Sequence, residues 1–98
     1  MASSKEYLHF ILDQLSEAEG IRTRAMMGEF LLYTREVLIG GIYDDRFLVK
    51  PSPRALALMP DAPRERPYEG AKEMLLVGRV DDRAFLAELL EALYLDLR

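Results

Sequence analysis

Apolar residues recur at helical spacing near the start and at the end of the chain. Two serines precede the first apolar stripe and Gly20 closes the segment, which predicts a helix over residues 4–18. Asp81 or Asp82 is expected to cap a second helix near the other end of the sequence. The stripes that would face the core are Leu8, Ile11, Leu12 and Leu15 in the first helix, and Phe85, Leu86, Leu89, Leu90, Leu93 and Leu97 in the last.

Short apolar runs separated by turn-forming residues replace this spacing between residues 21 and 50. They predict an antiparallel meander in which residues 34–36 and 44–46 form hairpin loops. Gly40-Gly41 interrupts the third run, and such a pair weakens a strand and marks a bulge or a close approach of two backbones. The expected strands contain residues 24–27, 30–33, 37–39 and 47–49.

The segment from Pro51 to Pro67 is set apart by its five prolines. Only residues 53–59 have a helical pattern, with proline in the first turn, so the rest is expected to be an ordered loop. Residues 74–77 then predict a fifth strand. The whole chain, residues 1–98, is therefore expected to be a single α+β domain. It would be an antiparallel sheet of about five strands with an N-terminal and a C-terminal helix packed on one face.

The charge balance of the chain argues against nucleic acid as a partner. The 98 residues include 13 Lys and Arg against 17 Asp and Glu, a net charge of −4 that is divided evenly between the two halves. Direct binding of nucleic acid or of an anionic membrane is not expected, because the field of the whole protein opposes it. The sequence has no cysteine, no signal peptide and no uncharged run of about 18 residues, which predicts a cytoplasmic protein without a membrane span.

Few residues of the sequence suit catalysis or metal binding. His9 is the only histidine, and without cysteine it leaves a carboxylate-rich oxygen site as the only metal option. It lies at the edge of the first apolar stripe and is expected to be solvated. The pairs Asp44-Asp45 and Asp81-Asp82 suit structural roles, in a hairpin turn and at a helix N-terminus. No serine has the surroundings of a nucleophile and no phosphate-binding glycine loop is present. We therefore expect no enzyme activity, no cofactor and no metal site.

Three segments of the chain share their order and residue pattern with a known family. They are Arg24-Ala25-Met26-Met27-Gly28 with the apolar run that follows it, residues 41–50, and Pro67-Tyr68-Glu69-Gly70. Over roughly residues 7–93 the chain resembles the TfoX N-terminal domain family, named for a bacterial competence regulator. The motif residues that carry the resemblance include Arg24, Met26, Met27, Gly28, Tyr33, Gly41, Tyr43, Lys50, Tyr68 and Gly70.

The resemblance implies structural roles for these motif residues and supplies no catalytic residue. The segment 24–28 is expected to be a strand that ends in a sharp turn at Gly28, with its two methionines filling the core between sheet and helix. Glu29 stands where many members of the family have glycine, and Arg35-Glu36 stands where they have an Asp-Gly turn. The 98 residues do not include the second, helical domain of full-length competence regulators.

Together these features predict a non-catalytic regulatory or protein-interaction module, linked through the resemblance to transcriptional or competence regulation. A homodimer is also expected, since Phe10 falls on the polar side of the first helix and Leu95 lies opposite the main stripe of the last. Two alternatives stay open. A small-molecule or metal-binding domain would use the acidic turn and the proline-rich loop, whereas a direct DNA binder would need a local basic patch.

Overall fold

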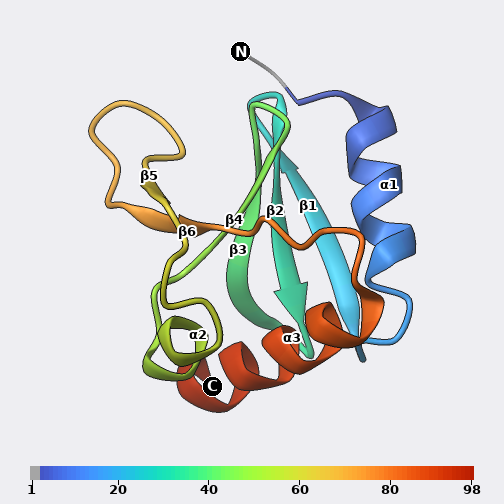
Figure 1. The fold of residues 1–98 in the computed structure, drawn as a ribbon. Coiled ribbons are helices and arrows are strands. Elements are labelled where there is room, and N and C mark those ends of the chain that lie inside the picture. Colours follow the sequence, from blue (N-terminus) through green and yellow to red (C-terminus); the bar gives the residue numbers. More distant parts are fainter. Residues whose placement is uncertain (1–2) are drawn as a thin grey trace.

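Three helices and six strands make up the computed structural model, which describes residues 3–98 (Figure 1). The prediction that there is no signal peptide rests in part on Met1 and Ala2, which lie outside the described residues. The helices are α1 (Lys5–Gln14), α2 (Pro53–Leu58) and α3 (Arg83–Leu97). The strands are β1 (Ile21–Met26), β2 (Glu29–Thr34), β3 (Val37–Tyr43), β4 (Arg46–Val49), β5 (Arg64–Glu65) and β6 (Met74–Leu76).

The strands form one antiparallel sheet, and the helices pack on one of its faces. The strand order is β1-β2-β3-β4-β6-β5, and all neighbouring strands are antiparallel. Apolar side chains of α1, α2 and α3 meet those of the sheet in one core, in which Ile11, Phe47 and Leu89 are fully buried. The predicted α+β fold is confirmed. In the described part of the chain, no helix is long and apolar enough to cross a membrane.

The sheet has one strand more than the sequence predicts. Strand β5 lies within the proline-rich segment expected to be a loop, and it pairs with the first two residues of β6. Pro63, just before β5, has no N–H to donate to the sheet. It still fits this pairing because its carbonyl accepts a hydrogen bond from the Leu76 N–H at 2.9 Å. A strand of two residues is too short to show alternation of apolar and polar positions, so the pattern gives no sign of it.

Helix α1 ends at Gln14, four residues before its predicted end. The chain must reverse direction there to reach β1, and the turns that achieve this end at Gly20, with a φ of 64°. The hydroxyl of Thr34 donates a hydrogen bond to the Glu19 carbonyl at 2.7 Å, which ties the turn to the sheet. Apolar spacing continues beyond Gln14 because Leu15 still packs in the core, although it lies outside the helix.

All three hairpins of the meander are closed by two-residue turns in which both residues have a positive φ. The turns are Met27-Gly28, Arg35-Glu36 and Asp44-Asp45, with φ between 47° and 86°. Turns of this kind match the twist of the flanking strands and favour Asn, Asp and Gly. Arg35 and Glu36 therefore hold a conformation that is costly for side chains other than these.

Glu36→Gly is expected to be more stable than Glu36→Ala by about 1 kcal/mol, because a φ of 67° is free of strain for glycine but not for alanine. Both variants lose the exposed ion pair with Arg22, so the comparison cancels that loss. Urea unfolding of the two variants measures the difference. Equal unfolding midpoints would contradict a strained turn at this position.

Candidate binding surface on the open face of the sheet

The side of the sheet that points away from the helices carries a row of residues across five strands. Leu48 in this row is fully buried, yet it does not belong to the core formed with the helices. Two other leucines of the row, Leu31 and Leu76, are half-buried. Because side chains alternate between the two faces of a strand, residues paired across strands share a face. We call this side the open face. Its longest row consists of Arg24, Leu31, Gly41, Leu48 and Leu76.

A second row, formed by Arg22, Tyr33 and Leu38, belongs to the same face near the edge strand β1. The guanidinium carbon of Arg22 lies 4.3 Å from the centroid of the Tyr33 ring, and its Nε pairs with the Glu36 carboxylate at 3.0 Å. Arg24 is also exposed, and it forms no ion pair with any residue from 3 to 98. This edge of the sheet therefore presents two arginines beside half-buried apolar and aromatic side chains.

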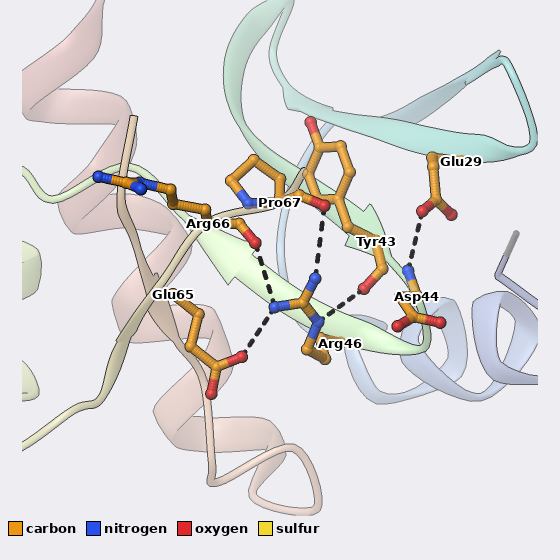
Figure 2. Close-up of polar contacts among 7 residues, drawn as sticks. All are labelled: Glu29, Tyr43, Asp44, Arg46, Glu65, Arg66 and Pro67. Carbon is orange, nitrogen blue, oxygen red and sulfur yellow. Dashed lines mark hydrogen bonds and ion pairs between the residues drawn. The ribbon is translucent and has the colours of Figure 1, made fainter. Parts of the chain in front are cut away.

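A loop of residues 66–73, which we call the overhanging loop, projects from the sheet between β5 and β6 (Figure 1). Figure 2 shows how Arg46 holds it. Nη1 of Arg46 donates to the Arg66 carbonyl at 3.2 Å and Nη2 donates to the Pro67 carbonyl at 3.4 Å. Nη1 also pairs with the Glu65 carboxylate at 2.8 Å, and Nε donates to the last carbonyl of β3 at 3.2 Å. One guanidinium thus joins the β3–β4 hairpin to β5 and to the loop.

A cavity of about 510 Å³ lies between the overhanging loop and the sheet. Its walls come from β3, the segment after β4, the loop, the start of β6 and the end of α3. Lys50, Lys72 and Glu73 are the charged residues that line it. The apolar walls include Leu38, Pro51, Ala71, Met74 and Leu97.

Two tyrosines stand together in the wall of this cavity. The ring centroids of Tyr43 and Tyr68 are 6.4 Å apart, and the ring planes are tilted by 56°. Tyr43 is 5% exposed, whereas Tyr68 is 58% exposed. Burial raises the pKa of the Tyr43 hydroxyl, and the nearby Tyr68 and Glu29 raise it further. The hydroxyl therefore stays protonated near neutral pH and can donate a hydrogen bond.

Glu29 ties the N-terminal segment to the tips of two hairpins. Its carboxylate accepts hydrogen bonds from the Ser3 N–H at 2.8 Å and from the Ser3 hydroxyl at 2.7 Å. It also accepts a hydrogen bond from the Asp44 N–H at 3.0 Å, which Figure 2 shows. Asp45 accepts a hydrogen bond from the Ser4 N–H at 2.8 Å. Glu29 thus has a structural role, and the acidic turn Asp44-Asp45 has the structural role predicted for it.

The two methionines of the segment 24–28 do not fill the core, contrary to the prediction. Met27 is 97% exposed at the tip of the β1–β2 hairpin, where it occupies a turn position with a φ of 51°. Met26 is half-buried at the end of β1 and lies outside the core. Gly28, with a φ of 86°, makes the sharp turn that the sequence predicts.

Most of the other motif residues come together on the open face and around the cavity. A Cβ added to Gly41 would lie 2.8 Å from the Tyr43 ring, so a side chain at this position would collide with that ring. Gly70 makes a turn in the overhanging loop with a φ of 86°. These residues are Arg24, Tyr33 and Gly41 on the open face, and Tyr43, Lys50, Tyr68 and Gly70 at the cavity or in its loop.

Phe10 and Leu95 are exposed as predicted, at 43% and 37%, but they lie far apart. Phe10 is in α1, where its ring centroid is 6.2 Å from that of Tyr7. The end of α1 contacts the start of α3 through the ion pair between Asp13 and Arg83 at 2.7 Å. From Arg83 to Leu95 the α-helical rise per residue gives a distance of about 18 Å along α3. A homodimer that uses both residues stays a prediction.

The other residues that the sequence offered for catalysis or metal binding are exposed to solvent or have structural roles. His9 is exposed on α1 and does not line the cavity. Asp82 caps α3, and its Oδ1 accepts a hydrogen bond from the Phe85 N–H at 3.0 Å. Among residues 3–98, no group of three or more His, Asp or Glu side chains is arranged to hold a metal ion. The candidate binding surface is therefore the open face together with its cavity.

The chain is similar to a protein of Spirochaeta aurantia named "Uncharacterized 12.7 kDa protein in trpE 5'region". The two sequences are 31% identical over 84 residues, which cover 86% of this chain and 73% of that protein. No family model matches the chain. No solved structure matches it either.

Proposed function

The chain belongs to the same family as the 12.7 kDa protein of Spirochaeta aurantia, and we propose that it is a non-catalytic regulatory module that binds a protein partner. The observation that carries the proposal is the open face, where a row from Arg24 to Leu76 places apolar side chains beside an exposed arginine, on the side away from the helices. The resemblance to the TfoX N-terminal domain supports the regulatory part. The absence of cysteine from the sequence supports a cytoplasmic location.

The charges of the open face favour a partner with acidic side chains. Arg22 and Arg24 point to the same side of the edge strand β1. If two copies of the chain paired antiparallel through β1 in the register centred on Thr23, Arg22 of each copy would lie opposite Arg24 of the other, and like charges in opposite positions destabilise a sheet. We therefore propose that the partner on this surface is a different protein. Its carboxylates would pair with Arg24, and its apolar side chains would cover Leu31.

Site-specific photo-crosslinking tests this surface. A photoreactive phenylalanine analogue in place of Leu31 is expected to capture one partner protein in cells that carry the chain naturally. The same analogue in place of His9, which is exposed on α1, is expected not to capture that protein. Mass spectrometry identifies the captured protein. Capture of the same protein from both positions would contradict a partner that is specific for the open face.

Charge reversal on the edge strands gives an independent test of the proposed partner chemistry. Arg24→Glu is expected to reduce crosslinking of the partner to the analogue at position 31 by about tenfold or more. The introduced carboxylate would repel the carboxylates of the partner. Arg64→Glu is the control, since Arg64 is an exposed arginine of the other edge strand, β5, and forms no ion pair in the described part of the chain. An equal effect of the two reversals would contradict the proposal.

A further inference from the structure

We propose that the cavity beneath the overhanging loop binds a small organic anion, a carboxylate, sulfonate or phosphate attached to an aromatic or aliphatic body. The volume of about 510 Å³ falls within the range of roughly 300–1,000 Å³ that is typical of small-molecule pockets. The inference does not depend on the proposed protein partner, which would bind the part of the open face next to β1.

The apolar walls select the body of the ligand. Leu38, Met74 and Leu97 reach the cavity from β3, β6 and α3, three elements that are far apart in the sequence. The rings of Tyr43 and Tyr68 add an aromatic section to this wall. An aromatic or aliphatic body that fills the space between them removes apolar surface from water, which is the main source of affinity in pockets of this kind.

The charges around the cavity select the head group. Lys50 and Lys72 line the cavity together with a single acid, Glu73, so the lining has an excess of one positive charge in a protein whose net charge is −4. They are two of the three lysines in the sequence. Neither forms an ion pair within residues 3–98, whereas six arginines do. Two ammonium groups without a carboxylate partner favour an anionic group and oppose a cation.

Other occupants fit these observations less well. A neutral apolar molecule would use the walls but leave both lysines without a partner. A polyanion would extend beyond the cavity onto an acidic protein, where the field opposes it. The protonated hydroxyl of Tyr43 adds a hydrogen-bond donor to the wall, which suits the oxygen atoms of an anion.

Anilinonaphthalene sulfonate, an aromatic sulfonate whose fluorescence rises in apolar surroundings, is the probe for this site. We expect saturable binding of one probe molecule per folded chain. Naphthoate is expected to displace the probe about tenfold better than naphthylmethanol or naphthylmethylamine, which are neutral and cationic molecules of similar size. Absence of saturable binding up to millimolar concentration would overturn the proposal, and so would equal displacement by all three competitors.

Substitution of the lysines tests which residues recognise the anion. The double variant Lys50→Gln and Lys72→Gln is expected to weaken probe binding by about tenfold or more. Lys5→Gln removes the third lysine, which lies at the start of α1 away from the cavity, and is expected to leave binding unchanged. Circular dichroism checks that each variant is folded. Wild-type affinity in the double variant would overturn the assignment. Capture of a protein at Leu31 is measured separately, so failure of the cavity proposal and failure of the partner proposal give different results.

Discussion

Replacing Gly40 by alanine is expected to destabilise the protein by about 3 kcal/mol and to lower its melting temperature by about 15 °C. An alanine Cβ at this position would overlap the carbonyl oxygen of Leu48 and would lie 2.8 Å from the Cα of Val49. Both are backbone atoms of β4 in the middle of the sheet, so neither moves far without breaking the pairing of β3 with β4. The close approach of these two strands thus requires glycine.

Gly78→Ala provides the control for this prediction. A Cβ added to Gly78 would have no atom within 4 Å, and its φ lies outside the left-handed region, so the change in stability is expected to stay within about 0.5 kcal/mol. Thermal and urea unfolding of both variants give the comparison. If Gly40→Ala unfolds at the same midpoint as Gly78→Ala, the two backbones are farther apart than the structure places them.

The same glycine pair shows how far a local sequence pattern can predict the fold. Gly40-Gly41 within an apolar run predicts a bulge or a close backbone approach, and both occur. The pairing of β2 with β3 shifts between Leu32 and Tyr33, which leaves Ile39 as an extra residue in β3. The spacing of apolar residues determines which side of a helix or strand faces the core. For this reason the sequence also predicts helices α1 and α3 and the four strands of the meander.

Contacts between distant segments account for what the sequence does not predict. Methionine is apolar, which favours the core for Met27, but residue type alone does not reveal a turn with positive φ that points the side chain into water. The residues that Arg46 holds in β5 and the overhanging loop are 19 to 21 positions away along the chain. The cavity combines short pieces from five parts of the chain, and although Tyr43, Lys50 and Tyr68 belong to motif segments, nothing in the sequence shows that these segments meet around one cavity. Leu31 and Tyr33 lie two positions apart in β2, so both side chains point to the open face of the sheet. Their apolar and aromatic character is the sequence signal that could have indicated a second apolar face.

Arg46→Met is expected to release the overhanging loop and to destabilise the protein by about 2 kcal/mol. The guanidinium of Arg46 donates to three backbone carbonyls and to the Glu65 carboxylate, and its side chain is 26% exposed. Methionine keeps the aliphatic stem of the side chain but leaves these acceptors without their donor. Amide hydrogen exchange in residues 66–73 is therefore expected to become faster, while exchange in α3 changes only with global stability.

Arg22→Met distinguishes this effect from the general loss of an arginine. Arg22 also pairs with a carboxylate and lies over an aromatic ring, but its side chain is 47% exposed, so its loss is expected to cost less than about 1 kcal/mol and to leave the loop unchanged. The overhanging loop brings Tyr68 and Lys72 to the wall of the cavity, although Arg46 itself is not part of that wall. Arg46→Met is therefore also expected to weaken the binding of anilinonaphthalene sulfonate, and Arg22→Met is not. Wild-type exchange rates in residues 66–73 of Arg46→Met would show that other contacts hold the loop.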